Sequence, residues 1–296
     1  MKEKIRQLAQ EKNAIILAHN YQPPEIQDIA DLCGDSLELS IKAAQTTAKI
    51  IIFCGVHFMA ETAYILSPEK TILLPAPDAG CPMADMVDPV ALTAKKQELG
   101  NIPVITYVNS SAAVKAVSDI CCTSANVVKI VNSIEANEVL MTPDKNLAQY
   151  AQANTSKKIH LWNGFCPFHN TLTAADVLTA KATHPDALFI AHPECPLEVL
   201  ALADSIQSTS GMITYAEQSD HTSFILGTEN GLLYPIAKAT PNKQFYPASD
   251  KMLCPDMKKI TLEKILASLE NLFGQVTVPE YIRIKALGSV EKMINL

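Results

Sequence analysis

Short apolar runs alternate with longer stretches of helical periodicity along most of the chain. Three of these runs end in polar groups: AIILAHNYQ from Ala14, PVITYVNSS from Pro103 and ALFIAHPEC from Ala187. Each is followed by a second short strand and a hydroxyl-rich turn: DLCGDS, DICCTS and DSIQSTS, which end at Ser36, Ser124 and Ser210. Strands that alternate with helices predict crossover connections and parallel sheets.

The pattern then continues in the same way three times. A helix-like stretch leads to a third strand (KIIIF, EVLMT, SFILGT), and another leads to a fourth (TILLP, KIHLW, KQFYP). A cysteine followed by proline comes next, at Cys81, Cys166 and Cys254, so the cysteines are 85 and then 88 residues apart. This regularity indicates an internal repeat. We therefore predict an α/β fold of three pseudo-threefold-related α/β/α sandwich units, with parallel sheets around a central cavity.

The repeat also predicts the domain boundaries. Residues 1–97 form the first α/β/α unit with Cys81, residues 98–183 the second with Cys166, and residues 184–296 the third with Cys254. After Cys254, the stretches ITLEKILASLENLF and PEYIRIKALGSVEKMI have helical spacing. We expect these two helices to belong to the third domain and to pack on the outside as closing helices.

Composition and charge exclude several classes of partner. The chain has 296 residues, of which 48% are hydrophobic and 19% charged, as in an ordinary soluble globular protein. Its 24 basic and 31 acidic residues give a net charge of −7, and no basic run suggests a nucleic-acid partner. The first apolar run, residues 14–18, is too short for a signal peptide or a membrane span. We expect a cytoplasmic protein that contacts no membrane.

Eight cysteines in such a chain favour metal binding or catalysis over structural disulfides. No pair has C-x2-C spacing, so a metal site must gather its ligands from distant segments. Cys195 stands at another position of the repeat than the Cys-Pro ligands after the fourth strands. Four cysteines lie in or just after apolar strands, where we interpret them as small buried hydrophobic residues: Cys33, Cys54, Cys121 and Cys122.

Polar side chains follow the first strand of each unit: His19 and Tyr21, Tyr107 and Asn109, His192 and Glu194. Parallel sheets bind ligands at the carboxyl ends of their strands. If the three units face inward, their cysteines meet and these side chains surround them. Three thiolates bind three irons of a [4Fe–4S] cluster and leave the fourth open to substrate, whereas an electron carrier normally has four protein ligands.

Ordered motifs along nearly the whole chain resemble those of the quinolinate synthases. They include AHNYQ (18–22), CGDS (33–36), CPMADM (81–86), YVNS (107–110), CTSAN (122–126), GFCPFH (164–169), HPEC (192–195), STSGM (208–212), GTENGLLY (227–234), FYPA (245–248) and CPDMKKITLEKIL (254–266). The resemblance implies condensation of iminoaspartate with dihydroxyacetone phosphate to quinolinate, phosphate and water in NAD biosynthesis. It also implies functional coupling to L-aspartate oxidase, which supplies the iminoaspartate.

The resemblance further implies roles for individual residues. The cofactor would be one [4Fe–4S] cluster with three ligands, Cys81, Cys166 and Cys254, and one open iron that acts as a Lewis acid. His19 and His192 would grip a substrate carboxylate. Hydrogen bonds to carboxylate or phosphate oxygens would come from Ser36, Asn109, Ser124, Ser208 and Thr209. The proton-transfer candidates are Tyr21, Tyr107 and Glu194.

Other functions use the same residue types. A zinc lyase or hydrolase would bind through cysteine, histidine and glutamate, but HExxH and C-x2-C are absent. An iron–sulfur sensor would usually carry a DNA-binding unit, and a dehydrogenase would carry G-x-G-x-x-G. We interpret His169 as a support of the cluster loop, His57 as an ordinary helix-capping residue and His221 as a surface residue.

Overall fold

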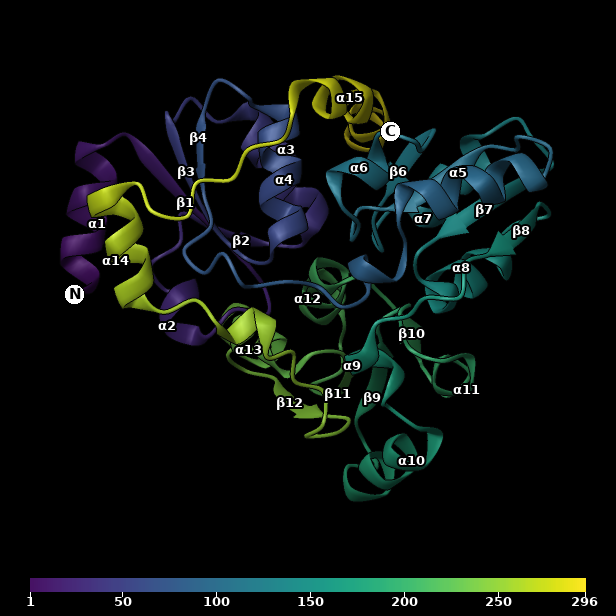
Figure 1. Cartoon of the computed structure of the whole chain (residues 1–296). Coiled ribbons are helices and arrows are strands. Elements are labelled where there is room, and N and C mark those ends of the chain that lie inside the picture. The colour runs from purple at the N-terminus through teal and green to yellow at the C-terminus, as the bar shows by residue number, and fades with distance from the viewer.

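Three four-stranded parallel sheets form the framework of the molecule (Figure 1). The computed structural model describes residues 1–296. Unit one has the strands β1 (Ala14–His19), β2 (Leu32–Gly34), β3 (Ile50–Cys54) and β4 (Thr71–Leu73). Unit two has β5 (Val104–Tyr107), β6 (Ile120–Cys122), β7 (Glu138–Thr142) and β8 (Lys158–Leu161). Unit three has β9 (Leu188–Ala191), β10 (Ser205–Ile206), β11 (Ser223–Gly227) and β12 (Gln244–Pro247).

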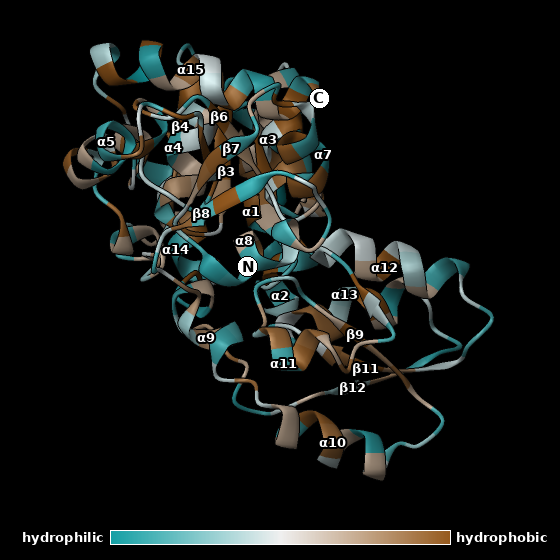
Figure 2. Ribbon diagram, turned by 90° about the vertical axis from the view of Figure 1, so that its right-hand side faces the viewer, coloured by the Kyte–Doolittle hydropathy of each residue, from teal (hydrophilic) through white to brown (hydrophobic).

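All three sheets have the same strand order and the same connections between strands. Their strand orders are β2-β1-β3-β4, β6-β5-β7-β8 and β10-β9-β11-β12, and every pairing is parallel. In each unit the second strand is added on one side of the first strand, and the third strand on the other side. Side chains that follow the first and third strands therefore flank one crevice. The inner strands β3 and β11 are apolar and buried (Figure 2).

Short-range capping determines where the longer helices begin. In unit one, Asp35 accepts hydrogen bonds from the backbone N–H groups of Leu37 and Glu38 and starts α3 (Ser36–Gln45). In unit two, Asp144 accepts from Leu147 N–H and starts α8 (Lys145–Gln152). In unit three, Ser208 accepts from Gly211 N–H and starts α12 (Thr209–Gln218). Each of these helices begins just beyond the carboxyl end of a strand.

The remaining helices cover the sheets or connect the units. They are α1 (Lys2–Glu11), α2 (Pro24–Gln27), α4 (His57–Leu66), α5 (Pro89–Glu98), α6 (Ala112–Lys115), α7 (Val127–Ser133), α9 (Pro167–Asn170), α10 (Ala174–Thr183), α11 (Leu197–Leu200), α13 (Leu233–Ala239), α14 (Leu262–Asn271) and α15 (Glu280–Asn295). Three short 3₁₀ turns complete the chain: η1 (Ala84–Met86), η2 (Asn230–Leu232) and η3 (Asp256–Lys258).

The two C-terminal helices close the molecule away from unit three. Helix α14 packs against α1, and α15 packs against α4, α6 and β6, so that it spans units one and two (Figure 1). The side chain of Ser289 in α15 donates a hydrogen bond to the carbonyl of Lys115 at 2.9 Å. Asn126 donates to the carbonyl of Met293 at 3.0 Å. Unit two is thus sealed by the end of the chain.

These observations confirm the predicted α/β fold with three repeated units and parallel sheets, and both closing helices form. The domain boundaries after residues 97 and 183, and a central cavity on a threefold axis, stay predictions. No helix in the structure has both the length and the apolar character that crossing a membrane requires.

The central strand β1 gives a direct test of the packing. Leu17 is fully buried and pairs in register with Leu32 on one side and Phe53 on the other. Because Leu17→Ala leaves a cavity there, we expect the free energy of unfolding to fall by about 2–5 kcal/mol in urea titrations followed by circular dichroism. The matched variant Leu178→Ala, on an exposed position of α10, should change it by less than about 0.5 kcal/mol. Equal effects would contradict the burial of Leu17.

Candidate active site

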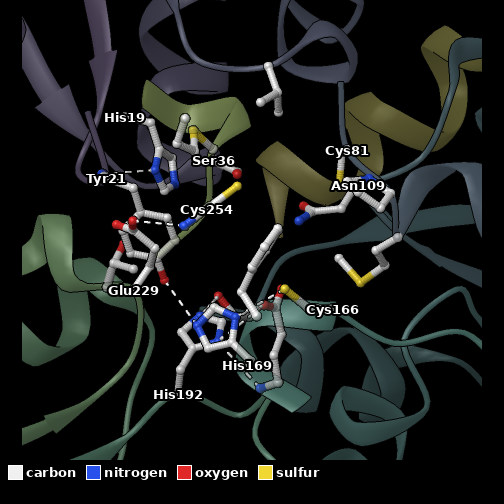
Figure 3. Close-up of a pocket in the computed structure, with 18 of the residues that line it drawn as sticks. His19, Tyr21, Ser36, Cys81, Asn109, Cys166, His169, His192, Glu229 and Cys254 are labelled. Carbon is white, nitrogen blue, oxygen red and sulfur yellow. Dashed lines mark hydrogen bonds and ion pairs between the residues drawn. The ribbon is translucent and has the colours of Figure 1, made fainter. Parts of the chain in front are cut away.

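One pocket is lined by side chains from all three units (Figure 3). Its lining residues lie at or just after the carboxyl ends of the strands, as parallel sheets require of a binding site. The sequence-predicted site residues that line it are His19, Tyr21, Ser36, Cys81, Tyr107, Asn109, Ser124, Cys166, His192, Glu194, Thr209 and Cys254. The fold therefore brings together twelve of the thirteen residues singled out from the sequence.

Ser208 is the exception. Its hydroxyl accepts from Gly211 N–H at 3.1 Å as the N-cap of α12, and it donates to a carboxyl oxygen of Asp35 at 3.2 Å. It lies in an adjoining polar groove, which it shares with Ser124. The structure thus gives Ser208 a capping function and a contact between units one and three, and its role in substrate binding stays a prediction.

The three cysteines that follow the fourth strands, each in a Cys-Pro pair, share one local structure. Each stands before a short helical turn, because the proline fits the first position of such a turn: η1 follows Cys81, α9 follows Cys166 and η3 follows Cys254. Backbone N–H groups of that turn favour the thiolate and lower its pKa: those of Met83 and Ala84 for Cys81, of His169 for Cys166, and of Asp256 and Met257 for Cys254. Figure 3 shows the three sulfur atoms around the same space.

Burial opposes ionisation of these thiols. It raises the pKa of Cys81 to about 12 and that of Cys254 to about 11, although the backbone donors act in the opposite direction. For Cys166, burial and the charge of Glu194 place the pKa well above its usual range. A buried thiolate needs a compensating positive charge, and a metal centre supplies one. The donor set therefore fits a metal cofactor.

The other cysteines behave differently. Cys54, Cys121, Cys122 and Cys195 are fully buried. The thiols of Cys121 and Cys195 donate to oxygen, at 3.6 Å to the Ser289 hydroxyl and at 3.3 Å to the carbonyl of Gly227. Cys33, half-buried, donates to the carbonyl of Gln27 at 3.4 Å. Burial agrees with the interpretation of Cys54, Cys121 and Cys122 as packing residues, and Cys195, which is not among the cysteines interpreted in this way from the sequence, is as fully buried as they are.

The two predicted substrate-binding histidines are neutral. Burial, followed by the charge of Lys258, lowers the pKa of His19 to about 3. Burial also lowers the pKa of His192 to about 3, and its Nε2 lies 3.2 Å from the Ser124 hydroxyl. A neutral imidazole has one donor and one acceptor nitrogen. Each ring can therefore donate to a carboxylate oxygen without carrying a charge of its own.

A hydrogen-bonded chain connects the three proton-transfer candidates. Tyr107 lies close enough to the Glu194 carboxylate for each group to shift the pKa of the other, and Glu194 Oε2 lies 2.7 Å from His169 Nδ1. On the other side of the ring, His169 Nε2 lies 3.0 Å from the Thr228 hydroxyl. Thr228 in turn lies 2.6 Å from the hydroxyl of Tyr21. His169 therefore connects groups that belong to all three units.

The pKa values of Glu194 and of the two tyrosines in this hydrogen-bonded series differ widely. Burial raises the pKa of Glu194, but the neighbouring His169, 2.7 Å away, lowers it, so that the carboxyl group stays ionised. Burial, followed by the charge of Glu194, raises the pKa values of both Tyr21 and Tyr107 well above their usual range. At neutral pH the pocket thus presents an ionised carboxylate beside two protonated tyrosines.

His169 lies as close to the cysteine as the sequence interpretation required. Its Nδ1 lies 3.2 Å from the sulfur of Cys166, and Cys166, His169 and Glu194 have ligand atoms within 4.8 Å of one another. This trio could hold a single metal ion. A cluster of several irons needs a wider set, because each cysteine then binds a different iron.

Sequence reasoning missed several buried polar residues that hold the site. Thr228 bridges Tyr21 and His169, and Asp144 and Glu229 accept hydrogen bonds from the backbone N–H groups of Cys166 and Cys254. Thr228 and Glu229 lie in the GTENG segment after β11, where the matched motif was the only signal. Their partners lie far away in the sequence, so no local spacing reveals them.

Thr228 provides a test of the hydrogen-bonded chain. Thr228→Val keeps the shape but leaves the buried Tyr21 hydroxyl without its nearest partner, so we expect the free energy of unfolding to fall by about 1–3 kcal/mol. Thr228→Ser keeps the hydroxyl and should stay close to the wild type. Urea denaturation of the cluster-free proteins measures both. A Val variant as stable as the Ser variant would show that the bond to Tyr21 contributes nothing.

Comparison with known proteins agrees with this arrangement. The family model described as quinolinate synthetase A protein matches residues 3–295. A quinolinate synthase of Geobacter metallireducens is 54% identical over 296 residues, which cover 100% of this chain and 97% of the relative. Quinolinate synthases of Methanosarcina barkeri and Dehalococcoides mccartyi are each 54% identical, over 99% of this chain and 96% and 97% of the relatives. The chain belongs to the quinolinate synthetase A family.

Proposed function

We propose that this chain is a quinolinate synthase, which condenses iminoaspartate with dihydroxyacetone phosphate to form quinolinate, phosphate and water for NAD biosynthesis. Family membership over nearly the full length supports the activity. The observation that carries it within the structure is the meeting of three equivalent Cys-Pro turns with neutral histidines, tyrosines and an ionised glutamate in one pocket.

We assign Cys81, Cys166 and Cys254 as the three protein ligands of one [4Fe–4S] cluster, with one iron open. The equivalent turns support this ligand set, because their backbone N–H groups favour the thiolate form that iron requires. When bound, the open iron supplies Lewis acidity, which acidifies neighbouring C–H and O–H bonds and assists the loss of water.

In this proposal, neutral histidines and helix N-termini bind the anionic groups of the substrate. His19 and His192 each donate a hydrogen bond to a dicarboxylate from opposite units. Ser36 and Thr209 are the first residues of the ten-residue helices α3 and α12, whose N-terminal dipoles favour anionic groups. The side-chain oxygen of Asn109 is buried without a hydrogen-bond partner in the pocket, so it is available to a substrate donor.

Proton transfer follows from the ionisation states. Glu194 is the ionised group and remains a candidate for proton transfer with substrate, while His169 beside it stabilises its orientation. Tyr107 and Tyr21 keep their protons, and each can turn its hydroxyl from its neighbour in the protein to an oxygen atom of the substrate that gains negative charge. The division between a carboxylate base and tyrosine donors is the arrangement that successive tautomerisations and dehydrations need.

We further propose that the protein works in the cytoplasm in functional coupling with L-aspartate oxidase. The reason is chemical: an imine such as iminoaspartate hydrolyses in water, so the enzyme that supplies it must act in the same compartment. No surface of this chain is assigned to that partner.

The ligand assignment predicts the outcome of cysteine substitution. Cys81→Ser, Cys166→Ser and Cys254→Ser should each abolish a stable four-iron cluster and turnover, whereas Cys33→Ser and Cys54→Ser should keep both. Iron and sulfide analysis with visible spectra after anaerobic reconstitution measures this. A full cluster in Cys254→Ser would refute the assignment. One metal ion and no sulfide in both Cys81→Ser and the wild type would favour a single ion held by Cys166, His169 and Glu194.

A second test concerns Tyr107. Tyr107→Phe removes the hydroxyl that influences the pKa of Glu194 and leaves the ring in place, so the cluster should still assemble. We expect kcat to fall by roughly a hundredfold or more, with a smaller change in KM, because general acid–base groups contribute on this scale. Anaerobic steady-state kinetics, after cluster content has been checked, provide the measurement. A normal kcat would make Tyr107 a packing residue.

A further inference from the structure

The three cysteine turns are equivalent in their backbone but not in the side chains that hold them. In each unit, the residue that follows the third strand by three positions donates a backbone hydrogen bond to the residue two positions before the cysteine. These bonds join His57 to Ala79 at 2.8 Å, Lys145 to Gly164 at 2.8 Å, and Asn230 to Met252 at 2.9 Å. The same scaffold therefore presents each turn, and any difference between the turns comes from side chains.

Two of the turns are held by a buried carboxyl group of their own unit. Asp144 accepts from the backbone N–H of Cys166 at 3.2 Å, and Glu229 accepts from that of Cys254 at 3.1 Å. Both acids stand two positions after the third strand. Unit one has Val56 at the same position, and the N–H of Cys81 has no hydrogen-bond acceptor within the protein. The Cys81 turn thus lacks the anchor that the other two possess.

A carboxyl group from another unit contacts the Cys81 turn instead. Asp256, in the turn that follows Cys254, accepts from the backbone N–H of Gly80 at 3.2 Å. Its carboxylate also forms an ion pair with Lys259 at 2.8 Å, and Lys259 donates to the carbonyl of Asp78 at 2.6 Å. The side chain of Asp256 is only 14% exposed, so this bond is largely protected from water. Asp256 and Lys259 together fasten residues 78–80 to the neighbouring cysteine turn.

The Cys81 turn also faces solvent from a second side. A surface depression that shares Phe58, Gly80 and Cys81 with the main pocket is also lined by Glu61, Asp78 and Asp85, among others. Neither Cys166 nor Cys254 lines it. Of the three cysteines, only Cys81 therefore borders this depression as well as the substrate pocket.

We propose that Asp256, supported by Lys259, is a positioning residue that holds the Cys81 turn in place of the anchor that unit one lacks, and that Cys81 is the first ligand released when the cluster is lost. The proposal rests on the proposed cluster ligands. Asp256 acts on the backbone beside Cys81 rather than on substrate, so its removal changes how long the cluster survives before it changes the chemistry.

The test compares Asp256→Ala, Asp256→Asn and the wild-type holoprotein under anaerobic conditions. Iron release to excess EDTA is followed by visible absorbance, and samples taken during release are alkylated with iodoacetamide and mapped by mass spectrometry. We expect Asp256→Ala to lose iron roughly tenfold faster, the scale typical of residues that orient metal ligands, with Cys81 alkylated before Cys166 and Cys254. Asp256→Asn keeps an acceptor for Gly80 N–H and should restore a near-normal rate.

Asp250→Ala is the matched control, since Asp250 is an exposed carboxylate shortly before Cys254 and should leave the rate unchanged. Loss of iron from Asp256→Ala at the wild-type rate, simultaneous alkylation of all three cysteines, or an Asn variant as labile as the Ala variant would each overturn the proposal. A wild-type protein that assembles no cluster would instead refute the proposed function, so the two failures are distinguishable.

Discussion

Desolvation of three thiols is the constraint on which the rest of the site depends. Each sulfur lies in a pocket where burial raises its pKa far above neutrality, so a thiolate persists there only beside strong positive charge. The protein supplies part of the compensation through backbone N–H groups of the turn after each cysteine. A metal centre supplies the rest. This is consistent with the helical turn that follows each of the three cysteines and with the buried acids that hold the backbone of two of these turns.

The same low-polarity pocket determines the states of its other groups. Neutral His19 and His192, protonated Tyr21 and Tyr107, and ionised Glu194 all follow from burial together with their immediate neighbours. A threefold repeat would give three equal sites if its side chains were equal. Because each unit ends its first strand with different residues, one pocket instead combines binding groups with a carboxylate base and hydroxyl donors.

Much of this architecture could be read from the sequence, because parallel strands and Cys-Pro turns recur at nearly constant spacing. The repeat predicted the strands, the place of the three cysteines and the polar residues after each first strand, and the resemblance to quinolinate synthases added Ser36, Ser124 and Thr209. Long-range contacts could not be predicted: Asp256 meets Gly80, and Thr228 meets Tyr21, across more than half of the chain. Ser208 shows the opposite failure, since its motif position places it near the pocket while its hydroxyl is used to cap α12.

The most direct test of the central claim is ⁵⁷Fe Mössbauer spectroscopy of the anaerobically reconstituted wild-type protein, with and without bound quinolinate. The account predicts a four-iron cluster in which one iron differs from the other three and changes its spectrum when quinolinate binds, because that iron has no cysteine ligand. Four equivalent irons whose spectrum does not change when quinolinate is added, or a single iron without sulfide, would contradict this prediction.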